Sequence, residues 1–447
     1  MQPSRRLTRR RAVQLSAATA ALPLVHIRSA GAAGKLNVGL WDHWVPRGND
    51  VMLKQIQTWA AKSKVEVQPD FITSQGNKLL LTVAAEAQAK TGHDFVPFLQ
   101  WDTIAYAEQL EPVDDVIKQL VDSYGKYDPV IEYLAKSKGY WAAVPGTDPT
   151  ANLTCCARIS MLKQYAGIDV QALYPAHPTD PRHAASWTYE AFLKAAEACH
   201  KAGFPFGLGL GQTGDSTNNT GAIFSAYGAD LVNAKGNITV DSDKVRQVME
   251  FGQRMVKFLP SDTVSYDDAS NNRALISGKS ALIYNPPSAW AVAKRDAPDV
   301  AKDCWTFPCP AGPAGRFIPY NYVFYGIWKF TRNKSAAKDL VHFLMERQQV
   351  EERTSVVEGF NLPPQISMSD FKIWEDVEPP KGTMYNYPIR PWHDSHPSLS
   401  GYPAPPEIAV QMYNRAVIPT MWAKLHSGQT IKQATDWAAQ EIEGFIR

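Results

Sequence analysis

Two short segments of this sequence bring tryptophan together with carboxylate and amide side chains. Residues 41–44 read Trp-Asp-His-Trp, and residues 100–102 read Gln-Trp-Asp. An indole ring offers a flat apolar face, and carboxylate and amide groups form hydrogen bonds to hydroxyls. These are the groups that suit sugars and polyols, so both segments supply candidate ligand-binding residues: Trp41, Asp42, His43, Trp44, Gln100, Trp101 and Asp102.

Further polar and aromatic residues follow apolar stretches later in the chain. Each has an alternative reading in which it only serves the fold, as a helix cap, a hinge contact or a core side chain. The spacing Gly207-x-Gly-x-Gly211 lacks the lysine of a phosphate loop and predicts a turn. The later candidates are Gln212, Thr213, Asp215, Asn285, Trp290, Tyr320, Asn321, Tyr322, Phe360 and Asn361.

No segment carries a motif for a nucleophile or for a general acid and base, so we expect a binding protein without cofactor or metal. His393 and His396 could ligate a metal, but a proline-rich loop gives them no fixed helical spacing, and a solvated loop is the favoured interpretation. In the same stretch Tyr387, Arg390 or Trp392 could form an accessory wall of a binding site.

The five cysteines are consistent with an oxidising compartment. Cys304 and Cys309 are close enough in sequence for a disulfide to close the loop between them, and Cys155 or Cys156 could bridge to Cys199. An odd count leaves at least one thiol unpaired, and the sequence does not fix the pairing.

Residues 1–33 have the three parts of an export signal. They contain six arginines and no acidic residue, an apolar stretch over 12–27 and a small-residue end at 29–33. Thr8-Arg9-Arg10-Arg11 is typical of a twin-arginine signal, and an ordinary secretion signal is the alternative. With no cysteine before Cys155 for a lipid anchor, we expect a protein free in a bacterial periplasm.

The remaining chain is that of a mildly acidic globular protein. The 447 residues carry 46 basic and 44 acidic groups, and without the leader the balance is 40 to 44. This disfavours nucleic-acid partners, which require an excess of basic groups. The mean hydropathy is −0.29, and no run of 18 apolar residues occurs that would span a membrane.

The order of predicted elements indicates an α/β fold. Strands are expected at 35–41, 65–71 and 94–99, with helices at 51–62 and 77–90 between them, which predicts a parallel sheet flanked by helices. The candidate segments at 41–44 and 100–102 follow the carboxyl ends of such strands, where ligands of these sheets bind. Past residue 146 the alternation starts again, with strands at 206–210, 280–284 and 322–328, helices at 187–203, 244–259, 272–276 and 334–345, a long loop over 362–406 and helix over 407–447.

The series of landmarks over the whole mature chain resembles the family 1 extracellular solute-binding proteins of ABC importers, the maltose-binding-protein-like family. One departure is Ser288, which stands where the family often places a stacking aromatic residue, with Trp290 two positions later. The segments that carry the resemblance are 91–95, 106–115, 139–145, 186–192, 276–282, 285–290, 307–315, 334–339, 358–363 and 428–434.

The resemblance implies a two-lobed periplasmic binding protein fold of type II, with an interlobe cleft and a hinge. Lobe one would hold residues 35–147 and 318–353, and lobe two residues 148–317 and 354–447, with hinges near 144–148, 317–320 and 355–359. A monomer would capture a sugar, polyol or short oligosaccharide and deliver it to a membrane permease. The alternatives are a polyamine or organic acid as solute, or a periplasmic glycoside hydrolase, which needs two carboxylates about 5–9.5 Å apart.

Overall fold

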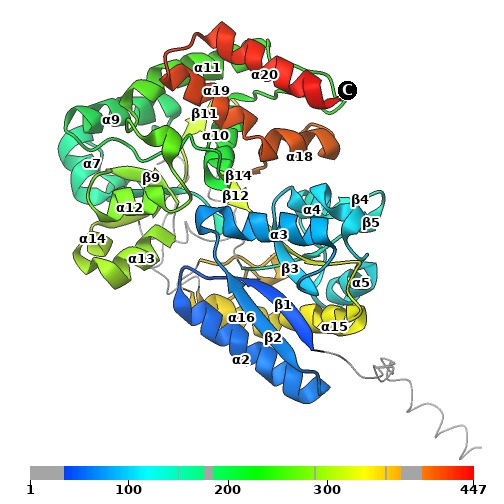
Figure 1. Ribbon diagram of the computed structural model, residues 1–447. Helices are drawn as coiled ribbons and strands as arrows, with labels where there is room; N and C mark the ends of the chain where they lie inside the picture. Colours follow the sequence, from blue (N-terminus) through cyan, green and yellow to red (C-terminus); the bar gives the residue numbers. More distant parts are fainter. Residues whose placement is uncertain are drawn as a thin grey trace, which may run out of the picture.

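The computed structural model describes residues 35–148, 151–175, 185–285, 288–357, 360–373 and 395–446. These residues form two lobes, each a β-sheet with helices around it, and the expected α/β fold is confirmed (Figure 1). Among the helices described, none is both long enough and apolar enough to cross a membrane.

The first lobe is built on a five-stranded sheet of order β2-β1-β3-β13-β6. β1 runs parallel to β2 and β3, as predicted, whereas β13 is antiparallel to β3 and β6 because it returns from the second lobe. The strands are β1 (Leu36–Trp41), β2 (Val67–Ile72), β3 (Phe95–Leu99), β6 (Val144–Pro145) and β13 (Val323–Ile327).

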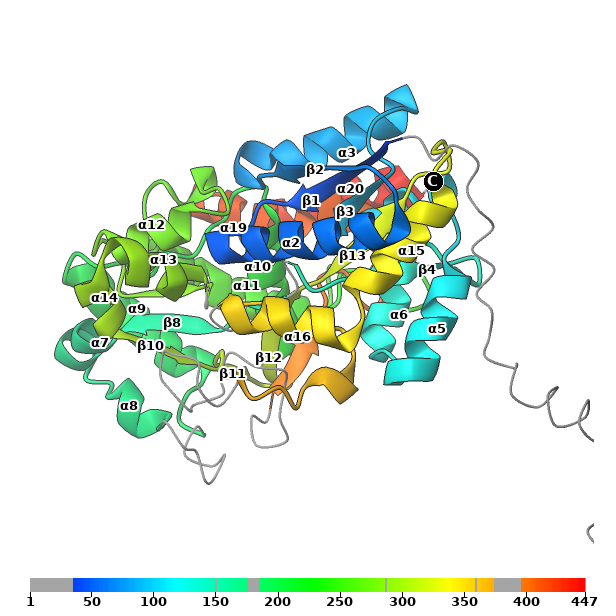
Figure 2. The ribbon, with the colours of Figure 1, turned by 90° about the horizontal axis from the view of Figure 1, so that it is seen from below.

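Helices cover both faces of this sheet. The first helix begins at Pro46 and not near residue 51 as predicted, because proline fits the first turn of a helix. Asn49 lies inside this helix, and its Oδ1 accepts from the backbone N–H of His43 at 3.0 Å. Figure 2 shows α2 and α16 near one another on the outside of the lobe. The helices are α2 (Pro46–Ser63), α3 (Lys78–Ala89), α4 (Asp102–Ala105), α5 (Asp114–Tyr124), α6 (Pro129–Ala135), α15 (Lys334–Leu344) and α16 (Arg347–Val356).

The second lobe has a three-stranded sheet of order β10-β8-β9, surrounded by helices. Its strands are β8 (Cys155–Arg158), β9 (Leu282–Tyr284) and β10 (Cys304–Phe307). Its helices are α7 (Ile159–Ala166), α8 (Val170–Leu173), α9 (Tyr189–Lys201), α10 (Gly214–Tyr227), α11 (Asp243–Met255), α12 (Ser270–Ile276), α13 (Ser288–Asp296), α14 (Pro298–Lys302), α18 (Pro406–Asn414), α19 (Val417–His426) and α20 (Ile431–Ile446).

The strand predicted at 206–210 does not form. Its backbone makes a local bond from Leu208 N to Phe206 O (3.0 Å). Its bonds to neighbouring segments are isolated: Gly207 N donates to Leu282 O, Leu210 N donates to Thr263 O, and Leu208 O accepts from the Thr263 hydroxyl. The stretch is largely buried but is not part of a β-ladder. The prediction was wrong because an apolar run indicates burial and does not distinguish a strand from packed irregular backbone.

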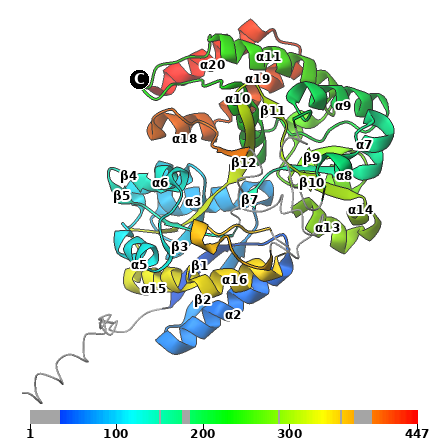
Figure 3. The ribbon, with the colours of Figure 1, turned by 180° about the vertical axis from the view of Figure 1, so that it is seen from behind.

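A third group of strands lies where the lobes meet. β12 (Gly315–Asn321) pairs with β11 (Ala311–Gly312), β7 (Ala151–Asn152) and β14 (Ser395–Ser398), and then leads into β13. Figure 3 shows β12 together with β11 and β7 between the two lobes. β14 and η6 (Ile366–Met368) fall within the loop predicted at 362–406. The other short elements are β4 (Lys136–Ser137), β5 (Tyr140–Trp141), η1 (Gln75–Asn77), η2 (Ala107–Gln109), η4 (Val256–Phe258) and η5 (Thr263–Ser265).

All five cysteines are buried thiols, and the disulfides considered from the sequence are not formed. The antiparallel pairing of β8 with β10 puts Cys156 and Cys304 in one apolar cluster, whereas Cys155, Cys199 and Cys309 belong to the main core. Cys155 and Cys156 point to opposite faces of β8, because side chains alternate along a strand. Cys309 lies beside Cys155 and Cys304 beside Cys156, so Cys304 and Cys309 are on different sides of the ladder.

Candidate functional site

A pocket with an empty volume of about 620 Å³, its open mouth included, lies between the two lobes. Its walls come from the loops after β1, β2, β3 and β9, from α10 and α18, and from the β12–β13 junction. The lining residues are Trp41, Trp44, Ser74, Leu99, Gln100, Leu153, Gly214, Asp215, Asp268, Asn285, Asn321, Tyr322, Phe360 and Tyr413.

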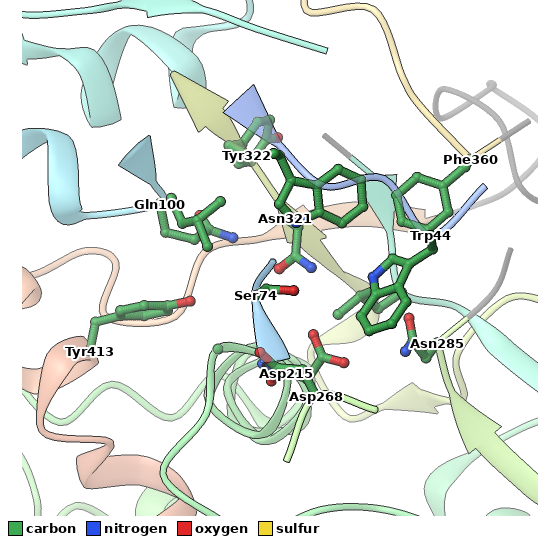
Figure 4. A pocket seen from close by; sticks show the side chains of 14 residues that line it. Trp44, Ser74, Gln100, Asp215, Asp268, Asn285, Asn321, Tyr322, Phe360 and Tyr413 are labelled. Atoms are coloured by element: carbon green, nitrogen blue, oxygen red, sulfur yellow. Dashed lines mark hydrogen bonds between the residues drawn. The ribbon is translucent and has the colours of Figure 1, made fainter. Parts of the chain in front are cut away.

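One wall of the pocket is aromatic. Trp41 ends β1, and its ring stacks on Phe360 with centroids 5.6 Å apart and planes at 29°. Trp44, in the loop before α2, meets Trp41 edge-on at 6.5 Å. Trp41 is only 5% exposed and Phe360 6%, whereas Trp44 is half-buried, so Trp44 presents more ring surface to a ligand. In Figure 4 its indole lies beside Asn285.

Two carboxyl groups stand at another side of the pocket, where α10 begins. Thr213 caps this helix by accepting a bond from Ser216 N (3.1 Å), which fixes Asp215 in the first turn. Asp215 N bonds to Oδ1 of Asp268 at 3.5 Å. Burial, followed by the charge of Asp268, raises the pKa of Asp215 well above its ordinary value, and burial likewise raises the pKa of Asp268.

Amide side chains connect these carboxyls to the rest of the wall. Asn271 donates to Asp215 Oδ2 (3.5 Å) and accepts from Asn285 (3.3 Å), while Asn321 accepts from Asn218 and also bonds to Asp215. A side-chain amide is neutral and carries both a donor and an acceptor, so these asparagines can form hydrogen bonds with ligand hydroxyls in either direction.

Gln100 supplies an acceptor that no described residue uses. Its backbone lies in the left-handed region (φ 48°), and its Nε2 donates to the carbonyl of Tyr320. The side chain is 1% exposed, and its Oε1 has no partner. A buried acceptor without a donor costs about 1–3 kcal/mol, which a ligand hydroxyl or N–H would recover.

The structure brings eight of the candidates predicted from the sequence into this lining. Six of them come from five separate segments, and both lobes contribute. The six are Trp41, Trp44, Gln100, Asn285, Asn321 and Phe360. Asp215 and Tyr322, which the sequence also offered, line the pocket as well.

Three predicted residues are buried away from the pocket. Trp101 is fully buried and donates from Nε1 to Ser400 O at 2.7 Å. Trp290 packs in the cluster around Cys156 and is 3% exposed. Asp102 begins α4 and is 7% exposed, and burial raises its pKa to about 7.

Asp42 and His43 turn away from the pocket although their neighbours line it. Asp42 is exposed and accepts from Asn49 (2.8 Å). His43 is buried, with Nδ1 accepting from Val45 N (2.9 Å) and Nε2 3.1 Å from Asn361 Oδ1. Burial lowers the pKa of His43, so the neutral ring with its proton on Nε2 fits these contacts.

The remaining three candidates also stand outside the lining. Gln212 is exposed and precedes α10, and Thr213 is the cap of that helix. Tyr320 stacks on Tyr322 at 5.2 Å and lines a neighbouring hollow with Asp128 and residues 362–366. Thr213 and Tyr320 thus support residues that line the pocket.

Six lining residues have no signal in the sequence. Asp268 lies in a turn of acidic residues that reads as solvated, and Tyr413 lies on an amphipathic helix where an aromatic residue reads as core. Only the three-dimensional arrangement brings them to the pocket. The six are Ser74, Leu99, Leu153, Gly214, Asp268 and Tyr413.

Tyr387, Arg390, Trp392 and His393 lie outside the described residues. His396, the other histidine of that stretch, is exposed on β14. In the part of the chain that the structure describes, no three His, Cys, Asp or Glu side chains are grouped so as to hold a metal ion.

The fold has counterparts among solved structures. Maltose-bound MalE3 of T. maritima aligns with a TM-score of 0.70 at 17% identity, over 92% of this chain and 99% of that one. A solute-binding protein of an ABC transporter from Thermotoga lettingae, bound to α-D-tagatose, gives 0.71 at 17% over 92% and 100%. A sugar transporter protein of Arthrobacter chlorophenolicus with laminaribiose gives 0.68 at 17% over 93% and 100%.

Curated protein sequences gave no match to this chain. The profile of the bacterial extracellular solute-binding proteins matches residues 54–378, which is well over half of the sequence. The resemblance read from the sequence is thereby confirmed, and the chain belongs to the bacterial extracellular solute-binding protein family.

Proposed function

We propose that this protein is the solute-binding subunit of an ABC importer and that its solute is a sugar, polyol or short oligosaccharide. The observation that carries the proposal is the pocket between the lobes, which is lined by the rings of Trp41 and Trp44 on one side and by the carboxyls of Asp215 and Asp268 on another. Aromatic faces accept the C–H side of a sugar ring, and carboxylates accept its hydroxyls. Maltose, tagatose and laminaribiose in the similar structures support the same class.

The solute would be held by closure of the two lobes. Lobe one would comprise residues 35–147 and 318–353, and lobe two residues 148–317 and 354–447. Three crossings near 144–148, 317–320 and 355–359 would act as hinges. Ligand binding favours the closed form because only that form lets both walls contact the solute. Small-angle X-ray scattering should show a smaller radius of gyration when the ligand is present.

The protein would bind its solute without changing it, and would work as a periplasmic monomer that docks on an inner-membrane permease. Residues 1–33 would be removed on export, which N-terminal sequencing of the periplasmic protein can test. Incubation with a bound oligosaccharide should return it intact. Release of a shorter sugar would instead favour a glycoside hydrolase that uses Asp215 and Asp268.

A ligand screen of the mature protein tests the central claim. Sugars, polyols, polyamines and organic acids are compared by thermal shift, and hits are measured by calorimetry. A ligand at one hundred times its Kd adds about 2.7 kcal/mol to the free energy of unfolding, so a true ligand raises Tm visibly. Organic acids should fail, since no Lys or Arg is among the described lining residues. Stabilisation by organic acids alone would contradict the proposal.

A further inference from the structure

The charges around the pocket are one-sided. Asp215 and Asp268 are the ionisable carboxyls of its described lining, and no lysine, arginine or histidine stands among those residues. The nearby cation Arg273 is bonded to the exposed carboxyl of Asp267 at 2.8 Å instead. Within the described chain the ligand space therefore faces two acids without a balancing positive side chain.

The contacts of the two carboxyls do not supply that balance. Asp215 receives bonds from the neutral amides of Asn271 and Asn321, and Asp268 from Thr213 and the backbone N–H of Asp215. The first turn of α10 adds only the partial positive charge of a helix start. If a neutral ligand covered the carboxyls of Asp215 and Asp268, each would have to take up a proton or remain as a buried negative charge without a cation.

Two further features of the pocket suit a positively charged donor. Oε1 of Gln100 is a buried acceptor without a donor, as described above. The rings of Trp41, Trp44 and Phe360 line the same space, and the half-buried Trp44 is the most exposed of the three. Aromatic faces attract cations within about 6 Å, and an ammonium group carries three N–H donors and no acceptor.

We propose that the solute of this site is an amino sugar, a hydroxylated ring whose protonated amine lies at Asp215 and Asp268 while its apolar face packs on the tryptophan wall. This inference rests on the proposed function and narrows its ligand class. The hydroxyls of the ring would serve the amides Asn285 and Asn321 and the free oxygen of Gln100. Uronic acids and sugar phosphates would be repelled by the same carboxyls.

Matched ligand series test the proposal by calorimetry at pH 7.5. Glucosamine, glucose, N-acetylglucosamine and glucuronate form one series, and galactosamine with its neutral, acetylated and acidic partners forms a second. We expect the amine of at least one series to bind ten times or more tightly than its hydroxyl partner, and no uronate to bind. N-acetylation removes the positive charge and should abolish the advantage.

Variants connect that preference to the two carboxyls. Asp215→Asn and Asp268→Asn should each lower the amine-to-hydroxyl affinity ratio about tenfold. Asp262→Asn is the matched control, because Asp262 is an exposed acid of the same segment outside the pocket, and it should leave the ratio unchanged.

The outcomes separate this inference from the proposed function. Neutral sugars that bind as tightly as their amines overturn the inference and leave a sugar-binding protein. An unchanged ratio in both pocket variants also overturns it. Binding of spermidine without binding of any sugar, or of no compound in either series or in the wider panel, overturns both.

Discussion

Arg353 and Asp148 form a buried ion pair at the place where the chain leaves the first lobe, with Nε of the arginine 3.0 Å from Oδ2 of the aspartate. The two side chains are 1% and 7% exposed. Arg353 also donates to Gln55 (2.7 Å) and Thr147 (3.0 Å), and Asp148 accepts from Asn361. The pair thus joins α2 and α16 to the proposed hinge segment 144–148 and, through Asn361, to the chain just after the third crossing.

Arg353→Ala should lower the free energy of unfolding by about 3–5 kcal/mol, because it leaves Asp148 buried without its cation. Urea unfolding followed by circular dichroism measures this. Arg347→Ala is the control on the same helix, since its ion pair with Asp370 is exposed and should contribute about 1 kcal/mol or less. Equal losses in the two variants would contradict the assigned role of the buried pair.

Trp44→Ala should weaken solute binding at least tenfold with little loss of stability, because the half-buried indole meets the pocket and only partly supports the core. Trp437→Ala is the matched control, a half-buried tryptophan on α20 outside the pocket, and it should keep full affinity. Calorimetry with the identified ligand measures both. Unchanged affinity in Trp44→Ala would remove the aromatic wall from the site.

Trp41→Ala should behave differently from Trp44→Ala. Trp41 is 5% exposed and packs on Phe360 and His43, so the truncation should cost about 3–5 kcal/mol of stability as well as affinity. Thermal unfolding without ligand separates the two effects. An apo Tm equal to that of the wild type would show that Trp41 is not part of the core.

Periodicity and residue type predicted the early strands and helices well, because alternating or amphipathic patterns determine which face is buried. β1 through β3 follow the predicted order, and the buried stripe of α20 follows Ala434, Ala438 and Ile442. The strand prediction at 206–210 was wrong because an apolar run indicates that a segment is buried but not how its backbone is hydrogen-bonded. β14 was missed because its pairing with β12 joins residues nearly eighty positions apart.

For the pocket, sequence reasoning succeeded where a polar or aromatic residue ends a strand, as Trp41 does, or directly follows one, as Gln100 and Asn285 do. The sequence could not show that Trp44 lines the pocket whereas Trp101 does not. Both tryptophans follow strands, and only the tertiary packing determines that Trp101 is fully buried. Tyr413 and Asp268 reach the pocket through tertiary contacts, which leave no local pattern.

The native protein purified from the periplasm should show no reactive thiol, and five thiols should react after denaturation. All five cysteines are at most 2% exposed, and burial raises the pKa of Cys199 to about 11, which keeps it protonated. Ellman's reagent with and without guanidinium gives both counts. A sample reduced before denaturation is the control, and a lower count without prior reduction would reveal a disulfide that the structure lacks.

Asp102 should make stability depend on pH. Its folded pKa of about 7 lies above the ordinary aspartate value of 3.8, because burial disfavours the charged form although Asn414 and the Leu99 backbone bond to it. Between these values the folded chain keeps a proton that the unfolded chain releases, so stability rises as pH falls from 7 toward 4. The gain relative to Asp102→Asn should be about 1.4 kcal/mol per pH unit, with no change above pH 8.

Urea unfolding at pH 8, 7, 6 and 5 measures this difference, and Asp50→Asn, which removes an exposed carboxylate, should run parallel to the wild type. A wild-type curve parallel to that of Asp102→Asn would mean that Asp102 is ionised in the folded protein at neutral pH.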